Sequence, residues 1–202
     1  YLQVILPDGQ RRAFSMANAP HESDGVQLHI RHVPSGHFSA GILPTLKAGD
    51  SLQLELPHGD FWLREDGDRP LIMVAGGTGF APIKSIIDHM VRSKISRPLA
   101  LYWGSRQVEG LYAPEVIAKW QRTLPGLRYV PVVSDAPADT WPGRTGLVHE
   151  AVLADHDDLS SYDVYACGAP AMVAALRRIC VEQSGLPEAR FFSDAFVSQA
   201  PQ

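Results

Sequence analysis

Leu71 to Pro82, LIMVAGGTGFAP, decide the fold, because this stretch joins an apolar run to a glycine-rich turn. An uninterrupted apolar run of this length is typical of a strand buried on both faces of a parallel sheet. Apolar side chains then recur at helical spacing through residues 83–91, and amides at such a helix start form an anion site. The stretch therefore predicts a phosphate-binding strand–turn–helix in preference to a plain tight turn. Pro82 stands in place of the third glycine of the common dinucleotide fingerprint, which indicates a different lineage.

Strand and helix signals continue to alternate after this turn, to the C-terminal end of the chain. Repeated βα units of this length predict a mostly parallel, doubly wound sheet. The later predicted strands cover residues 99–103, 128–133, 163–167 and 190–193, and the predicted helices cover residues 113–123, 146–154 and a segment beginning at Pro170.

The chain before the turn shows a different, β-rich pattern. Leu2–Leu6 and Arg12–Ser15 flank an Asp-Gly pair, which is a strong hairpin signal. Val26–Val33 and Ser51–Leu56 are predicted as two more strands, the second with one half-buried leucine face, and Gly36–Leu43 as a short helix. We therefore expect an antiparallel β-domain over residues 1–66 and an α/β domain over residues 67–202. Four strands do not close a barrel, so we expect the first domain to be an N-terminally incomplete part of a longer parent.

Composition narrows the possible classes of protein. The chain has 202 residues and a net charge of −4 without a basic cluster, which gives no electrostatic reason to expect nucleic acid or a membrane surface. Two cysteines favour a reducing compartment, and the expected location is the cytoplasm. A ferredoxin-type iron–sulfur cluster needs about four thiolates, so this chain cannot hold one by itself. The eight histidines show no metal-ligand spacing, and no metal site is expected.

Four motifs occur in an order that resembles the ferredoxin–NADP reductase superfamily. They are the glycine turn of residues 76–82, Arg-Ala-Phe-Ser at residues 12–15, Tyr-Trp-Gly-Ser-Arg at residues 102–106 and Tyr-Ala-Cys-Gly-Ala-Pro at residues 165–170. Pro-His-Gly at residues 57–59 and Ser-Asp-Ala-Phe at residues 193–196 narrow the resemblance to NAD(P)H-flavin reductases and CDP-6-deoxy-delta-3,4-glucoseen reductases. The resemblance implies that the β-domain is a partial flavin-binding barrel and that the α/β domain binds a nicotinamide dinucleotide.

The same resemblance assigns flavin contacts to residues of both domains. Arg12 would grip a flavin phosphate, Phe14 would pack on the isoalloxazine, and Ser15 would donate a hydrogen bond near the N5 atom. The Gly-x-x-Ser motif of Gly36 and Ser39, with Phe38 between them, suits the FAD pyrophosphate. Phe196 would cover the flavin. Without the resemblance, Arg12 would be interpreted as a surface arginine and Ser15 as a hydroxyl on a strand. The Gly-x-x-Ser segment would be interpreted as a helix cap without a ligand, and the aromatic residues as packing side chains.

The implied nicotinamide contacts gather on three segments of the α/β domain. Cys167 is expected to position the nicotinamide and not to attack it, because no base is evident to activate a buried thiol. The resemblance makes Ser15 and Cys167 the catalytic residues. The expected NAD(P) contacts are Gly76, Gly77, Thr78, Gly79, Pro82, Ser105, Arg106, Cys167, Gly168 and Asp194.

The sequence does not decide between NADH and NADPH. An acid often contacts the ribose hydroxyls about 20 residues after the glycine turn, and none occurs after Trp103 until Glu109. Arg106 either attracts a 2′-phosphate or packs on the adenine. We expect NADH, because the NAD(P)H-flavin reductases and CDP-6-deoxy-delta-3,4-glucoseen reductases that the chain resembles often use it.

The resemblance predicts an enzyme that passes hydride from NAD(P)H to bound FAD. Electrons would then reach a protein acceptor or an iron–sulfur centre, expected as a 2Fe-2S cluster in a missing N-terminal segment or in an oxygenase or dehydratase partner. The rival enzyme reduces free FMN or riboflavin as a substrate. A third possibility is a subunit that binds FAD without turning over NAD(P)H.

Overall fold

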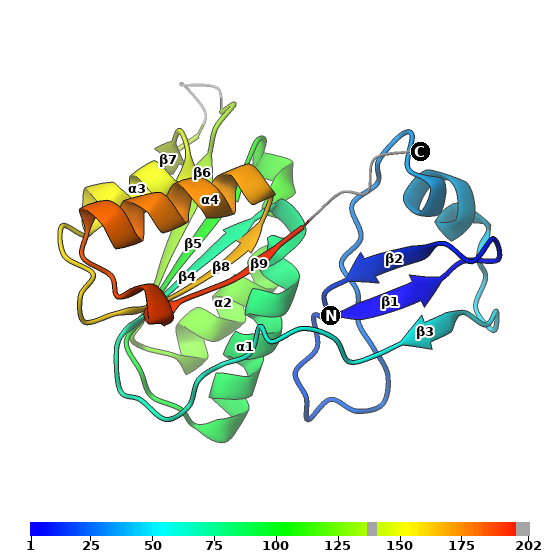
Figure 1. Cartoon of the computed structure of the whole chain (residues 1–202), viewed down its shortest axis with the longest axis horizontal. Helices are drawn as coiled ribbons and strands as arrows, with labels where there is room; N and C mark the ends of the chain where they lie inside the picture. The colour runs from blue at the N-terminus through cyan, green and yellow to red at the C-terminus, as the bar shows by residue number, and fades with distance from the viewer. Residues whose placement is uncertain (137–140, 197–202) are drawn as a thin grey trace.

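A computed structural model describes residues 1–136 and 141–196, which fold around two separate sheets (Figure 1). The first sheet is antiparallel, with strand order β2-β1-β3. Its strands are β1 (Leu2–Ile5), β2 (Arg11–Phe14) and β3 (Gln53–Glu55). Along the chain, the short helical turns η1 (His37–Ile42) and η2 (Leu43–Thr45) lie between β2 and β3. Leu2, Val4, Leu6 and Phe38 form the core of this β-domain.

The second sheet has six strands, all parallel, in the order β7-β6-β5-β4-β8-β9. Strand β4 is central because the chain first adds β5 to β7 on one side of it and then β8 and β9 on the other. The strands are β4 (Leu71–Gly76), β5 (Leu99–Ser105), β6 (Leu127–Val133), β7 (Arg144–Thr145), β8 (Asp163–Gly168) and β9 (Phe191–Ala195).

Helices cover both faces of the parallel sheet (Figure 1). Helices α1 (Phe80–Ser93) and α2 (Pro114–Thr123) cover one face, and α3 (Val148–Asp155) and α4 (Pro170–Arg178) cover the other. The short turns η3 (Gly77–Gly79), η4 (Val108–Gly110), η5 (Ile179–Gln183) and η6 (Glu188–Arg190) complete the α/β part. The side chains of β8 are all buried, as expected for a central strand of a doubly wound sheet. The predicted fold class is confirmed.

Two predicted strands of the β-domain differ from the structure. Val26–Val33 forms no strand, and its ladder pairing is a single bridge between Met16 and Leu28. The side chains of this segment contact other parts of the molecule, since Leu28 packs on the β-domain core and His29 stacks on Phe80 of α1. Leu52, Leu54 and Leu56 are 41%, 38% and 45% exposed, so the face predicted to be half-buried is largely uncovered.

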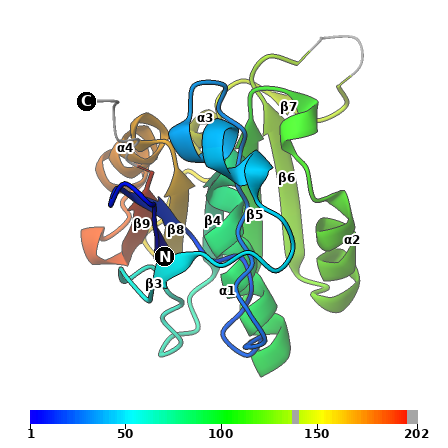
Figure 2. The ribbon, with the colours of Figure 1, turned by 90° about the vertical axis from the view of Figure 1, so that its right-hand side faces the viewer.

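The two domains contact each other on the side where β9 ends. Figure 1 shows β9 running toward the β-domain, and Figure 2 views the molecule from the side of the β-domain, which lies in front of the parallel sheet. Two side chains of α1 bond to backbone carbonyls of the first domain: Lys84 Nζ donates to Ala17 O at 3.2 Å and Ser85 Oγ donates to Asn18 O at 2.8 Å. The contact therefore fixes the first domain against the start of α1.

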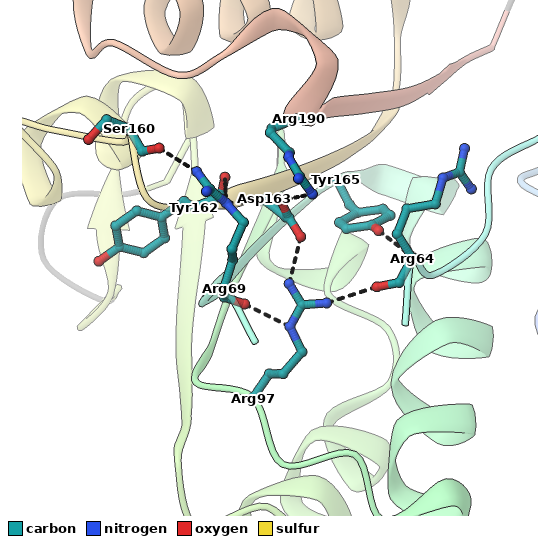
Figure 3. A network of polar contacts seen from close by, with 8 residues as sticks. All are labelled: Arg64, Arg69, Arg97, Ser160, Tyr162, Asp163, Tyr165 and Arg190. Carbon is teal, nitrogen blue, oxygen red and sulfur yellow. Dashed lines mark hydrogen bonds and ion pairs between the residues drawn. The ribbon is translucent and has the colours of Figure 1, made fainter. Parts of the chain in front are cut away.

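Residues 56–70 connect the two sheets without a helix or strand of their own. A polar network at the starts of β4 and β8 holds this connection in place (Figure 3). Arg97 donates to Asp163 Oδ2 at 2.6 Å, to Arg64 O at 2.9 Å and to Arg69 O at 2.7 Å. The backbone N–H of Arg64 also donates to the hydroxyl of Tyr165 at 2.9 Å. Two buried strands and one buried arginine thus anchor the connecting segment.

Within residues 1–136 and 141–196, no helix has the length and apolar character needed to cross a membrane.

Candidate functional site

The glycine turn lies where the order of the parallel strands reverses. Strand β4 is followed along the chain by its neighbour β5, whereas its other neighbour, β8, comes much later. In open α/β sheets this reversal leaves a crevice at the carboxyl ends of the strands, which is where ligands bind. Gly77 and Gly79, which follow β4, and Cys167 and Gly168, which end β8, meet at this crevice.

Two glycines of the turn have separate structural requirements. A Cβ atom on Gly79 would lie 2.1 Å from the carbonyl oxygen of Cys167, so the turn packs directly on the end of β8. Gly77 has a φ of 54°, and a Cβ atom there would meet nothing within 4 Å. The turn is therefore wedged against β8 on one side and open on the other, and its geometry fits a phosphate approaching the backbone.

A buried indole holds the carbonyl of the turn. Trp103 Nε1 donates to Gly77 O at 3.0 Å, and the ring of Trp103 stacks on Phe80 with centroids 3.8 Å apart and planes 6° from parallel. Thr78 lies in the same turn, and Pro82 is buried in the first turn of α1. The sequence motifs did not indicate the contact between Trp103 and Gly77, because it requires the neighbouring positions of β4 and β5.

Three polar side chains meet where the domains touch. Ser15 Oγ, from the end of β2, donates to Asp194 Oδ2 of β9 at 3.1 Å, across 179 residues of chain. Asp194 pairs in register with Cys167 of β8. Burial, followed by the negative charge of Asp194, raises the pKa of the Cys167 thiol well above its ordinary value. Cys167 therefore remains a neutral thiol, suited to lining a pocket and not to nucleophilic attack.

Phe196 lies beside the same point. Its backbone N–H donates to Gly168 O at 2.9 Å, and its ring is half-buried against the core beneath α1 and α2. The structure thus brings together Ser15, Cys167, Gly168, Asp194 and Phe196, which the sequence motifs assigned to two different ligands.

The other predicted flavin residues lie on the β-domain. Arg12 and Phe14 alternate along β2 and face the same side of the sheet. Arg12 Nη1 donates to Arg11 O at 2.9 Å, and the ring of Phe14 lies 5.3 Å from that of Phe38. These side chains supply a guanidinium and an aromatic surface on the domain that also presents Ser15, and this donor set fits the phosphate and ring of a flavin.

The Gly-x-x-Ser segment spans the start of η1, with Gly36 directly before this helical turn and Ser39 inside it. Ser39 Oγ accepts a hydrogen bond from the backbone N–H of Val33 at 3.0 Å. A Cβ atom on Gly36 would lie 2.6 Å from that hydroxyl oxygen, so a larger residue there requires the Ser39 side chain to shift. The structure thus shows the Ser39 hydroxyl bonded within its own segment, to the backbone of Val33.

Ser105 and Arg106 lie at the end of β5, on the same edge of the sheet as the glycine turn. Arg106 forms an ion pair with Asp135, which follows β6, with Arg106 Nη2 3.0 Å from Asp135 Oδ2. Asp135 has no place in the sequence motifs, because its position beside Arg106 depends on the pairing of β5 with β6. The two residues place one positive and one negative charge at this part of the crevice.

Fold and site together define a class: a β-domain with flavin-type donors joined to an α/β domain with a dinucleotide turn, in contact at Ser15 and Asp194. Comparison with family models agrees with this class. Residues 1–62 match the oxidoreductase FAD-binding domain, and residues 73–178 match the oxidoreductase NAD-binding domain. The chain belongs to the ferredoxin reductase-like oxidoreductases that combine these two domains, as the motifs predicted.

Several relatives are similar over nearly the whole chain. Reductase component 1 of terephthalate 1,2-dioxygenase from Comamonas sp is 45% identical, over 98% of this chain and 58% of the relative. CDP-6-deoxy-L-threo-D-glycero-4-hexulose-3-dehydrase reductase from Yersinia pestis is 44% identical, over 98% of this chain and 58% of the relative. The NAD(P)H-flavin reductase of Vibrio harveyi is 35% identical, over 97% of this chain and 84% of the relative. The chain thus spans little more than half the length of the first two relatives.

A solved structure shows the same fold. The ferredoxin reductase in carbazole 1,9a-dioxygenase superposes with a TM-score of 0.85 and 26% identity, covering 97% of this chain and 59% of that protein. FAD and NAD are therefore the nucleotides of the two matched domain families, and the chain carries both of these domains.

Proposed function

We propose that the chain takes hydride from NAD(P)H, delivers it to a bound FAD, and passes the electrons on to an iron–sulfur or other protein acceptor. One observation carries this proposal: Ser15 of the FAD-type domain donates to Asp194 of the NAD-type domain, in register with Cys167. A hydride donor and acceptor must meet between two such surfaces. The proposed domain boundary follows residue 66, within the connecting segment of residues 56–70.

The flavin would be held mainly by the β-domain. In this proposal Arg12 contacts a phosphate, Phe14 and Phe196 border the ring, and Ser15 donates to it. Gly36, Phe38 and Ser39 provide the second loop. Bound FAD supplies the redox chemistry, accepting hydride and releasing electrons singly, and the protein supplies binding and alignment.

The nicotinamide dinucleotide would lie along the edge of the parallel sheet. The amides of Gly77, Thr78 and Gly79 face its pyrophosphate, with Gly76 and Pro82 shaping the turn. Cys167, Gly168 and Asp194 border the nicotinamide, and Ser105 and Arg106 approach the ribose. Cys167 acts as a neutral side chain that excludes water and sets the distance between the rings.

The proposed electron acceptor is an oxygenase or dehydratase partner, reached through a 2Fe-2S centre. The names of two relatives support this, since one is the reductase component of a dioxygenase and the other is a dehydrase reductase. The centre would lie outside residues 1–202, because Cys167 and Cys180 are too few to hold it. We propose a cytoplasmic location, in keeping with these two free thiols.

A second candidate function is the reduction of free flavins, which then diffuse away. The similarity to the NAD(P)H-flavin reductase of Vibrio harveyi, over 84% of that relative, favours it. The two functions differ in whether the flavin stays bound.

Purification tests these functions directly. The main proposal expects a yellow protein whose flavin absorbance bleaches when NADH is added without oxygen. A colourless protein that reduces added riboflavin supports the second candidate. A yellow protein that neither NADH nor NADPH bleaches contradicts both functions and leaves only a flavin-binding module.

Two substitutions test the assignment of the ligands to the domains. Arg12→Ala should weaken flavin retention, because a charge-assisted contact contributes about 1.5–3 kcal/mol. Gly77→Val should raise the KM for the nicotinamide nucleotide and leave the flavin content unchanged.

A further inference from the structure

The carboxyl ends of β5 and β6 carry a charged pair, Arg106 and Asp135, of which the proposed function assigns a role only to Arg106. Backbone pairing continues past the two strands: Ser134 N donates to Ser105 O at 3.0 Å and Asp135 N donates to Arg106 O at 2.8 Å. Arg106 and Asp135 therefore stand side by side on the edge that also carries the glycine turn, since Gly104 pairs in register with Gly76. The backbone fixes this arrangement independently of the two side chains.

The guanidinium of Arg106 is directed at a single carboxylate oxygen. Its Nε and Nη2 atoms donate to Asp135 Oδ2 at 3.1 and 3.0 Å. The other oxygen, Oδ1, accepts a hydrogen bond from Ser134 Oγ at 3.0 Å. Hydrogen bonds from Ser134 and Arg106 hold the pKa of Asp135 below its ordinary value, so the carboxylate is charged at neutral pH.

Both charges remain accessible to a ligand. The side chain of Arg106 is 86% exposed and that of Asp135 is 44% exposed. An unpaired arginine at this edge would attract a 2′-phosphate. A carboxylate beside it repels that phosphate and accepts a hydrogen bond from a 2′-hydroxyl, so one group both favours the hydroxyl and disfavours the phosphate.

We infer that Asp135, paired with Arg106, makes the chain selective for NADH over NADPH. This inference rests on the proposed function, because it takes the edge beside the glycine turn as the site of the adenosine ribose. Asp135 contributes an acceptor for the 2′-hydroxyl, and it also neutralises the arginine that a 2′-phosphate would use.

The test compares both donors in four proteins: the unmodified chain, Asp135→Asn, Arg106→Ala and Glu109→Gln. Asparagine keeps the size of the side chain and removes the charge, which should raise kcat/KM for NADPH about tenfold relative to NADH. Arg106→Ala should lower NADPH use further, because the remaining positive charge is lost. Glu109→Gln is the matched control, since Glu109 is an exposed acid of the neighbouring turn η4, three residues after Arg106. The ratio of kcat/KM for NADPH to kcat/KM for NADH should be the same in Glu109→Gln as in the unmodified chain.

Equilibrium binding separates this inference from the proposed function. Calorimetry with 5′-AMP and with adenosine 2′,5′-bisphosphate needs no flavin and no turnover. The unmodified chain should bind 5′-AMP more tightly than the bisphosphate, and Asp135→Asn should reverse or erase that preference. If neither nicotinamide donor is oxidised but the binding preference shifts as stated, the proposed function fails and the inference stands. An unmodified chain that prefers NADPH, an unchanged ratio in Asp135→Asn, or an equal shift in Glu109→Gln overturns the inference.

Discussion

Two aspartates on neighbouring strands of the parallel sheet have very different surroundings. Asp163, at the start of β8, is 1% exposed and lies 2.6 Å from Arg97, with Arg69 and Arg190 3.4 and 3.5 Å from its other oxygen. Asp194, near the end of β9, is half-buried and accepts a hydrogen bond from Ser15 of the other domain. One carboxylate is surrounded by arginines of its own domain, and the other links two domains.

The difference separates a structural role from a functional one on the same sheet. A buried charge is costly unless several partners compensate it, and Asp163 has them. Figure 3 shows that these partners converge from three parts of the chain: the connecting segment (Arg69), the stretch between α1 and β5 (Arg97) and η6 (Arg190). Asp194 lies at the carboxyl ends of the strands, beside Cys167, where a ligand of a doubly wound sheet approaches. The amino-terminal edge of the parallel sheet thus carries residues that stabilise the fold, and its carboxyl edge carries the candidate functional residues.

Removing Asp163 should have the largest effect. Asp163→Ala leaves Arg97, which is 4% exposed, without its carboxylate. We expect the free energy of unfolding to fall by about 3–5 kcal/mol, as for other broken buried pairs. Urea unfolding monitored by circular dichroism measures it. Asp157→Ala, at an exposed aspartate nearby, is the control. A loss within about 0.5 kcal/mol, the range of ordinary surface changes, would contradict the structural role.

Ser15→Ala should affect catalysis more than stability. The variant removes the hydroxyl that donates to Asp194 and, in the proposed function, to the flavin. A hydrogen bond to a charged group contributes about 1.5–3 kcal/mol, so reduction of the flavin by saturating NADH should slow by about 10- to 160-fold. Anaerobic stopped-flow absorbance measures the rate.

The control for this variant is Ser85→Ala. Ser85 also donates across the domain interface, to Asn18 O at 2.8 Å, but from helix α1. If both variants slow reduction equally, the interface as a whole matters, and the contrast between Asp194 and Asp163 loses its functional meaning.

The sequence predicts those features whose signals are local. The strand, turn and helix of residues 71–91 are contiguous, so periodicity and glycines reveal them. The strand expected at Val26–Val33 is wrong because its residues pack on both domains and not on a neighbouring strand. The contact between Ser15 and Asp194 spans 179 residues, so periodicity gives no sign of it, and the resemblance assigned the two residues to different ligands without predicting that they meet.

Charged residues at strand ends are the main features that the sequence did not predict. Asp163 opens an otherwise apolar strand, which is a signal that a buried charge needs partners. The identity of those partners depends on which strand starts meet, and Arg97 is 66 residues away. Asp135 and Arg106 likewise meet only once β6 is paired with β5.

Trp103→Phe should have a smaller effect, confined to nucleotide binding. Phenylalanine retains the stacking on Phe80 and removes the donor to Gly77 O. A net hydrogen bond of about 0.5–1.5 kcal/mol corresponds to a rise of roughly 2- to 12-fold in the KM for NADH, with little change in kcat. Steady-state kinetics with the flavin-loaded protein measures both constants. Trp120→Phe is the matched control, because Trp120 is equally buried and its Nε1 donates to Asp88 and not to the turn. The positioning role of Trp103 is contradicted if Trp120→Phe raises KM as much.

The smallest expected effect is a dependence of the domain contact on pH. His29 of the β-domain bonds through Nδ1 to the hydroxyl of Tyr112 at 2.8 Å, and its ring stacks on Phe80. Burial, followed by the positive charge of Lys84, lowers the pKa of His29 from its ordinary value of 6.5. The unfolded chain therefore binds more protons than the folded one, and the stability from neutral His29 is present above pH 6.5 and is lost as the pH falls below it. Thermal unfolding between about pH 7 and pH 5 should show a steeper fall in Tm for the unmodified chain than for His29→Gln. Parallel slopes would mean that His29 does not couple the contact between the domains to protons.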